Sequence, residues 1–254
     1  MFSECNLGPG PNTRHLHQKS FLAGRIFSIK CVVNFILDLL FPKRCVSCGK
    51  FGDYICADCF SKIDFVEYPV CPVCQRQAVG GKTHPGCKKR FGLDGLVVMC
   101  KYRGPVRKAV QKIKYRFTAD IHKILVDLIA DSIWRFSLPK NIVLVPIPLY
   151  RLRKNWRGFN QAELLASDLA KRFGENFLSD LLVRTVDTKT QVGLSRNERK
   201  ENIKGAFRVG RKLNGENIVL VDDVFTTGST MMEAAKVLKM AGAGEVWAMA
   251  VALD

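Results

Sequence analysis

Apolar runs and helical periodicity alternate along the chain from about residue 93 onward. Strand-like runs cover Leu93–Tyr102, Ile142–Ile147, Ile218–Val221 and Glu245–Leu253, and helical patterns cover Arg103–Ser137 with a break near Thr118, Gln161–Phe173 and Ser229–Ala241. Leu178–Arg184 fits either a strand or the end of a helix. This alternation predicts an α/β fold, with an open, mainly parallel sheet and helices on both of its faces.

The first 40 residues follow a different pattern. Residues 1–20 are rich in Gly, Pro, His and polar groups, and we expect them to be disordered. The apolar segment Cys31–Phe41 is interrupted by Asn34 and Asp38 and is far shorter than the roughly 20 residues that span a bilayer. Because an A-x-A-like cleavage site is missing too, we interpret this segment as an amphipathic helix that packs onto the protein, with interfacial membrane contact as the alternative. We expect a cytoplasmic protein.

The chain has a formal net charge of +17 over 254 residues, which adds information about its binding partners. Such an excess implies an anionic partner, which is a nucleic acid, a phosphorylated substrate or an anionic membrane. Basic residues concentrate in Arg151–Arg157 and Arg184–Lys212, and further ones lie in Lys88–Arg90 and Arg107–Arg116. The total exceeds what one small substrate requires.

The segment Ile218–Thr230, IVLVDDVFTTGST, carries the most specific chemistry. Its apolar run predicts a buried parallel strand, so that Asp222 and Asp223 emerge at the carboxyl end, where open α/β sheets bind ligands. The loop Thr226-Thr227-Gly228-Ser229-Thr230 can direct backbone N–H groups and hydroxyls at a phosphate, helped by the positive end of the following helix. Two carboxylates beside that phosphate can accept hydrogen bonds from ribose hydroxyls.

A structural alternative for this segment is a strand, a solvated acidic turn and an ordinary helix start capped by Ser229 or Thr230. That alternative explains one acid well but two poorly, and it leaves the hydroxyl-rich loop without a purpose. We therefore favour the sugar-phosphate site.

Ten cysteines, most of them in C-x-x-C pairs, indicate metal rather than a secreted disulfide framework. The first candidate set is Cys45, Cys48, Cys56 and Cys59, and the second is Cys71, Cys74, His84 and Cys87. Each set completes a four-ligand shell, so the zinc is structural. Disulfides, a redox pair, simple packing, and a cross-braced arrangement that joins the first pair of each set remain alternatives.

Three motifs together give a resemblance to a known family. Ile218–Thr230 resembles the phosphoribosyl pyrophosphate (PRPP) motif of type I phosphoribosyltransferases, with Phe225 at a position that is more usually aliphatic. Val145–Ala166 and Thr190–Phe207 narrow the resemblance to the ComF family of competence-associated, phosphoribosyltransferase-like proteins, which typically carry a cysteine-rich N-terminal module. The resemblance covers about residues 41–254. It implies a type I phosphoribosyltransferase fold over 91–254, a double zinc-ribbon module over 41–90, and a tail with an amphipathic helix over 1–40.

The resemblance also implies roles for further residues. Arg157, in the basic loop after the strand Ile142–Ile147, is expected to hold the pyrophosphate of PRPP with Mg²⁺, and a solvated basic turn is the alternative. Arg196 and Arg199 are expected in a flexible loop, Thr190–Lys200, that closes over the substrate. Lys114 belongs to a KY element, although Lys112 or Arg116 could do the same work.

Two functions from different classes follow. The first is a protein of DNA uptake in natural transformation, which binds PRPP and Mg²⁺, handles single-stranded DNA and contacts proteins of the uptake machinery. The second is a phosphoribosyltransferase that displaces pyrophosphate from PRPP, with Asp222, Asp223, Arg196 and Arg199 as catalytic residues and an unidentified acceptor. Excess basic charge and the zinc ribbon favour the first function.

Overall fold

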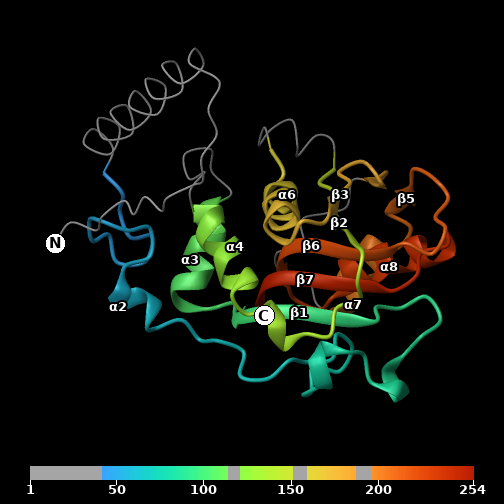
Figure 1. Ribbon diagram of the computed structural model, residues 1–254, viewed down its shortest axis with the longest axis horizontal. Helices are drawn as coiled ribbons and strands as arrows, with labels where there is room; N and C mark the ends of the chain where they lie inside the picture. The colour runs from blue at the N-terminus through green and yellow to red at the C-terminus, as the bar shows by residue number, and fades with distance from the viewer. Residues whose placement is uncertain (1–41, 114–120, 151–158, 187–195) are drawn as a thin grey trace, which may run out of the picture. The chain divides into compact units, whose positions relative to one another are not determined.

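A five-stranded parallel sheet organises the computed structural model, which describes residues 42–113, 121–150, 159–186 and 196–254 (Figure 1). The strands lie in the order β1-β7-β6-β2-β3, and every neighbouring pair is parallel. Their bounds are Gly95–Lys101 (β1), Ile142–Pro146 (β2), Asn176–Phe177 (β3), Asn217–Phe225 (β6) and Val246–Leu253 (β7). A separate antiparallel pair is formed by β4, Leu182–Arg184, and β5, Phe207–Val209. The predicted α/β fold is confirmed.

The sheet is covered on both faces by helices. The bounds are Ala57–Phe60 (α2), Gly104–Ile113 (α3), Ile121–Ala130 (α4), Gln161–Phe173 (α6), Arg196–Ile203 (α7) and Ser229–Met240 (α8), with single 3₁₀ turns at Val79–Gly81, Pro85–Cys87 and Ile133–Arg135. Residues of α3, α4 and α6 share one hydrophobic core with one face of the sheet, and residues of α7 and α8 share a second core with the other face. Because both faces are buried, the central strands are almost continuously apolar.

Helix α6 begins and ends where its sequence dictates. The Asn160 side chain accepts a hydrogen bond from the Ala162 N–H (3.1 Å) and donates one to the Ile147 carbonyl (3.0 Å), which joins the start of the helix to the end of β2. Gly174 ends the helix in a left-handed conformation with φ of 68°. The predicted bounds of this helix, Gln161–Phe173, are confirmed.

Two expectations about element bounds were wrong in part. Strand β6 does not end at Val221 but continues through the two aspartates to Phe225, because β7 is long enough to pair with it up to Leu253. The loop expected over Thr190–Lys200 is helical from Arg196 onward, where α7 buries Ile203 in the core beside α8. Residues 190–195 lie outside the described residues.

The cysteine-rich segment is anchored to the α/β core at several points. Cys45, Ile55 and Ile63 lie in the same hydrophobic core as α3, and the Lys108 ammonium of α3 donates to the Ser47 carbonyl (2.7 Å). At the start of β1, the nearly buried Asp94 carboxylate lies 3.4 Å from the Lys88 ammonium. It also lies 2.6 Å from the Lys239 ammonium and accepts a hydrogen bond from the Val246 N–H (2.9 Å). Residues 44–254 form one compact unit.

Within the described ranges, none of the helices combines the length and the apolar character that crossing a membrane requires.

Candidate functional site

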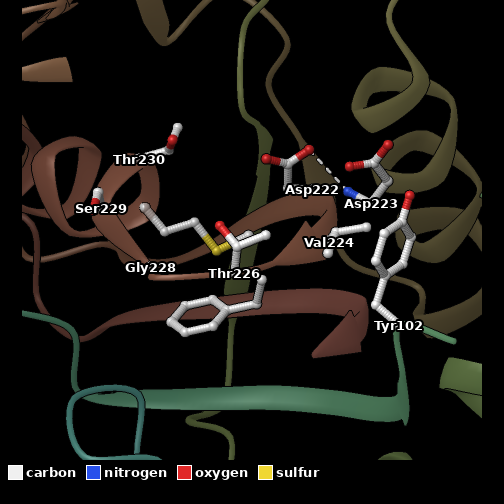
Figure 2. Close-up of a pocket in the computed structure, with 10 residues that line it drawn as sticks. Tyr102, Asp222, Asp223, Val224, Thr226, Gly228, Ser229 and Thr230 are labelled. Atoms are coloured by element: carbon white, nitrogen blue, oxygen red, sulfur yellow. Dashed lines mark hydrogen bonds between the residues drawn. The ribbon is translucent and has the colours of Figure 1, made fainter. Parts of the chain in front are cut away.

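A cavity of about 220 Å³ opens at the carboxyl end of β6 (Figure 2). Its lining consists of Tyr102, Asp222, Asp223, Val224, Phe225, Thr226, Gly228, Ser229, Thr230 and Met231. Both aspartates and the loop Thr226–Thr230 were predicted as site residues, and the structure brings all of them except Thr227 together in this cavity. Thr227 lines a neighbouring hollow. Figure 2 shows Asp223 and Tyr102 toward one end of the cavity and Ser229 and Thr230 toward the other. Their roles remain predictions.

The two aspartates owe their position to unequal pairing on the two sides of β6. Strand β2 pairs with β6 as far as Val221, whereas β7 pairs with it from Ile218 to Phe225. Asp222 and Asp223 are therefore held in an ordered strand yet stay half-buried rather than enclosed. One Asp222 carboxylate oxygen accepts a hydrogen bond from the backbone N–H of Asp223 (2.8 Å), which fixes that carboxylate against the strand.

The loop after β6 turns sharply at Gly228. This residue has φ of 71°, a region that favours glycine, and a Cβ there would lie 2.4 Å from the Phe225 ring. Gly228 is also the N-cap of α8, and it makes no side-chain cap hydrogen bond. The alternative in which Ser229 or Thr230 caps the helix is therefore wrong.

The start of α8 has the chemistry of an anion site. Gly228 brings no capping oxygen to the first turn, and the Thr227 hydroxyl accepts only a long hydrogen bond of 3.4 Å from the Ser229 N–H. An anion can therefore take the place that a capping oxygen occupies in other helices. The hydroxyls of Thr227 and Ser229 form a hydrogen bond of 2.7 Å, and the hydroxyl that accepts in it keeps its own proton for a bound oxygen. With the positive end of a twelve-residue helix beneath them, these groups suit a phosphate.

Several predicted residues cannot be placed in this site. Lys114 and Arg157 lie outside the described residues. Arg196 and Arg199 belong to α7, and their side chains also lie outside what the structure describes.

Sequence reasoning missed Tyr102 as part of the cavity lining. This residue follows β1, and its N–H donates to the Leu253 carbonyl at the end of β7 (2.6 Å). Tyr102 ends the predicted strand Leu93–Tyr102, and the carboxyl ends of parallel strands meet at one edge of a sheet, so its position near the site could have been suspected. The order of the strands, which places β1 beside β7, was needed to establish it.

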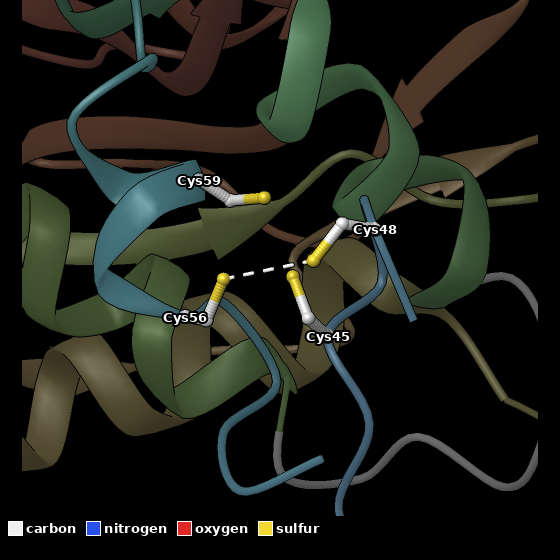
Figure 3. Close-up of side chains that lie close together, drawn as sticks. All are labelled: Cys45, Cys48, Cys56 and Cys59. Atoms are coloured by element: carbon white, nitrogen blue, oxygen red, sulfur yellow. Dashed lines mark hydrogen bonds between the residues drawn. The ribbon is translucent and has the colours of Figure 1, made fainter. Parts of the chain in front are cut away.

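The predicted metal ligands gather in two separate clusters. In the first, the sulfur atoms all lie within 4.8 Å of one another and point toward a common centre (Figure 3), and those of Cys48 and Cys56 are 3.7 Å apart. Tetrahedral zinc with Zn–S bonds of about 2.3 Å places its sulfurs roughly 3.8 Å apart. The second cluster joins Cys71, Cys74, His84 and Cys87 within the same limit. Each cluster therefore contains four ligands that follow one another in the sequence, and the cross-braced alternative, in which Cys45 and Cys48 share a metal with Cys71 and Cys74, is wrong.

In each cluster, hydrogen bonds favour the thiolate form of one cysteine. Burial raises the pKa of the Cys45 thiol, but three backbone N–H groups of the same ribbon together lower it to about 6. Hydrogen bonds from the backbone and side chain of Arg76 likewise lower the pKa of Cys74 to about 6. Because thiolates are the ligating form, these donors fit zinc. A hydrogen bond with Ser47 does not offset burial and the neighbouring cysteines at Cys59, whose pKa is raised to about 12, and burial raises the pKa of Cys87.

His84 is oriented as a ligand by its second ring nitrogen. Nε2 lies 2.9 Å from the Gln77 carbonyl, which can only accept, so Nε2 carries the proton. The lone pair of Nδ1 then faces the Cys74 sulfur, 3.3 Å away. A carbonyl that accepts from the ring nitrogen not bound to the metal commonly fixes the tautomer of a zinc-bound histidine.

Comparisons with known proteins agree with this arrangement. Residues 36–88 match the model of the double zinc ribbon domain, and residues 160–254 match that of the phosphoribosyl transferase domain. The parallel sheet, the two ligand clusters and these matches define a phosphoribosyltransferase-type domain that carries a structural double zinc ribbon.

Full-length relatives narrow the class further. Competence protein F of Haemophilus influenzae is 32% identical over 229 residues, which cover 83% of this chain and 97% of the relative. DNA utilization protein YhgH of Escherichia coli K12 is 33% identical, with 79% and 91% covered, and competence protein ComFC of Bacillus subtilis is 28% identical, with 74% and 79% covered. The chain belongs to the ComF family.

Separate clusters predict two independent zinc ions. We expect the purified protein to contain two zinc ions per chain, and Cys48→Ser and Cys74→Ser each to lower the content by one, since each removes a ligand from a different shell. Cys100→Ser, in a buried cysteine outside both clusters, is the control and keeps both. Elemental analysis after gel filtration measures the content. A single zinc in the wild type would contradict the two-cluster assignment.

Proposed function

We propose that the protein binds Mg-PRPP in the cavity at the end of β6 and acts in DNA uptake by handling single-stranded DNA. The proposed binding of Mg-PRPP is supported by one observation: two half-buried aspartates and the hydroxyl-rich start of α8 line the same cavity. Carboxylates recognise hydroxyl groups and the helix start recognises a phosphate, and a ribose 5-phosphate carries both.

Each part of the cavity then has a defined task. The Thr226–Thr230 loop holds the 5-phosphate with N–H groups and hydroxyls, and this remote binding energy positions the ribose. Asp222 and Asp223 accept hydrogen bonds from the ribose hydroxyls. Arg157, Arg196 and Arg199, whose side chains lie outside what the structure describes, are expected from the resemblance to neutralise the pyrophosphate, and Mg²⁺ would supply further positive charge there.

The DNA role is supported by the relatives and by charge. Two relatives are named competence proteins and a third a DNA utilization protein. A net charge of +17 exceeds what one PRPP molecule needs, and basic groups that neutralise phosphates drive binding to single strands. Proteins of the DNA-uptake machinery are the expected partners.

A second candidate function is a phosphoribosyltransferase reaction. Two carboxylates beside the ribose would favour the positive charge that develops on the sugar ring as pyrophosphate leaves. The half-buried placement of Asp222 and Asp223 at one cavity favours this candidate as well, so it is retained as the alternative.

Calorimetric titration tests the cavity as a sugar-phosphate site. We expect Mg-PRPP to bind the wild type saturably and the double variant Asp222→Asn/Asp223→Asn at least tenfold more weakly, because two charged hydrogen-bond acceptors are lost. Asp131→Asn, an exposed acid after α4, is the matched control and binds normally. Absence of Mg-PRPP binding to the folded, zinc-loaded wild type would refute the proposal.

A pyrophosphate-release assay separates the two functions. Under the DNA-handling proposal, Mg-PRPP stays intact when the protein is incubated with it and with oligonucleotides, nucleobases or ammonia. Sustained pyrophosphate release with one acceptor, lost in the Asp222→Asn/Asp223→Asn variant, would establish the enzyme instead.

A further inference from the structure

A second and larger hollow lies along α8, beside the second zinc ribbon, which is the segment that carries the cluster Cys71, Cys74, His84 and Cys87. Its volume is about 700 Å³, and it extends between the segment that follows Cys87, helix α7 and helix α8. Thr227 and Ser229 of the phosphate loop line it, and Ser229 also lines the smaller cavity. We call this hollow the ribbon groove.

We propose that the ribbon groove binds a segment of single-stranded DNA, with Phe91 as the platform on which a base stacks. This inference rests on the proposed DNA role and assigns it a surface. Three features of the groove support it, namely an exposed aromatic ring, an excess of positive charge and continuity with the phosphate loop.

Phe91 presents its ring in a form suited to stacking. The residue is 37% exposed although its neighbours Gly92 and Leu93 are more buried, and it lines the groove with the apolar Met232. The Arg90 guanidinium lies over the ring, 5.1 Å from its centroid. Aromatic rings stack bases with little sequence preference, and arginines add cation–π contacts, so the ring face that Arg90 does not cover suits a base.

The charge of the groove is complementary to a phosphate backbone. Its basic residues are Lys89, Arg90, Lys204 and Lys236, against the two carboxylates of Glu201 and Glu233. Both carboxylates have partners within the wall. Glu201 lies 3.8 Å from the Lys204 ammonium and Glu233 3.9 Å from that of Lys236, and Glu233 also accepts from the Gly205 N–H (2.9 Å).

The neighbouring Lys88 does not line the groove. Its ammonium lies 3.4 Å from the nearly buried Asp94 carboxylate, so it serves the junction between the ribbon and the sheet. Lys89 and Arg90 are the basic residues of this run that line the groove.

Fluorescence anisotropy with a labelled oligothymidylate tests the groove. Phe91→Ala should weaken binding on the order of tenfold without changing the salt dependence, since stacking is lost and charge is kept. Lys89→Gln/Arg90→Gln should instead reduce the slope of log K against log[salt] by about 1.4, because two phosphate contacts on a single strand are lost.

The first ribbon offers a matched control pair. Phe51 is 58% exposed, and the Arg44 guanidinium lies over its ring, 4.2 Å from the centroid. Phe51→Ala should bind the oligonucleotide as the wild type does. The groove assignment is overturned if Phe51→Ala and Phe91→Ala lower the affinity for the oligonucleotide equally. It is also overturned if Phe91→Ala and Lys89→Gln/Arg90→Gln both bind as the wild type does. A wild type that binds no oligonucleotide overturns the DNA role itself, and zinc content checks that each variant is folded.

A separate observation concerns the turn of the second zinc knuckle. In the C-x-x-C pairs Cys45/Cys48 and Cys71/Cys74, the residue after the second cysteine donates its N–H to the carbonyl of the first, at 2.8 Å for Gly49 and 2.9 Å for Gln75. Both residues have positive φ, 81° for Gly49 and 57° for Gln75. Glycine adopts this conformation readily, but glutamine rarely does.

The Gln75 side chain explains why glutamine occupies this position. Its Nε2 donates a hydrogen bond to the carbonyl of Thr226, the first residue of the phosphate loop (3.1 Å). We infer that Gln75 is a positioning residue, which holds the loop from the second zinc ribbon so that the N–H groups beyond Thr226 face the phosphate. This inference rests on the proposed binding of Mg-PRPP.

Gln75→Gly separates positioning from a structural role. The variant should keep both zinc ions and melt at the same or a higher temperature, because the conformational strain is relieved, yet bind Mg-PRPP about fivefold more weakly, because one hydrogen bond is lost. Gln75→Glu keeps the size but loses the donor, and it should weaken binding at least as much. Normal Mg-PRPP affinity in both variants overturns the inference, whereas a wild type without Mg-PRPP binding overturns the proposed function.

Discussion

The candidate site depends on the unequal pairing of strand β6 with its two neighbours. β2 supports β6 only as far as Val221, while β7 continues alongside it to Phe225. One-sided pairing keeps the backbone ordered and leaves Asp222 and Asp223 half-buried at the cavity. A shorter β7 would release the acids into a loop, and a longer β2 would enclose them. The sharp turn at Gly228 then places the start of α8 beside them.

The zinc clusters support this edge of the sheet. The described residues before β1 contain only isolated bridges, short turns and the four-residue α2. Because so little regular structure holds this segment together, metal binding by the two four-ligand clusters is expected to stabilise its fold. The first ribbon packs on α3, and the second contacts the phosphate loop through Gln75 and forms one wall of the ribbon groove. Metal binding and the candidate ligand sites are thus physically connected.

Much of this arrangement could be predicted from the sequence, because local signals were strong. Asn160 and Gly174 cap α6 at its predicted bounds, and the C-x-x-C pairs together with the H-x-x-C spacing of His84 and Cys87 identified both ligand sets. The IVLVDDVFTTGST segment located the cavity. Each of these features is set by residues close together in the chain.

The features that could not be predicted depend on contacts between distant residues. The extension of β6 depends on the length of β7, and the place of Tyr102 depends on the strand order. The hydrogen bond from Gln75 to Thr226 spans 151 residues, and the ribbon groove is assembled from four separate parts of the chain. No local pattern carries such information.

The most direct test of the account is a crystal structure of the zinc-loaded protein with Mg-PRPP. We expect the 5-phosphate to contact the backbone of Thr226–Thr230 and the ribose hydroxyls to donate to the carboxylates of Asp222 and Asp223. A ligand bound elsewhere on the protein, with this cavity empty at saturating concentration, would contradict it.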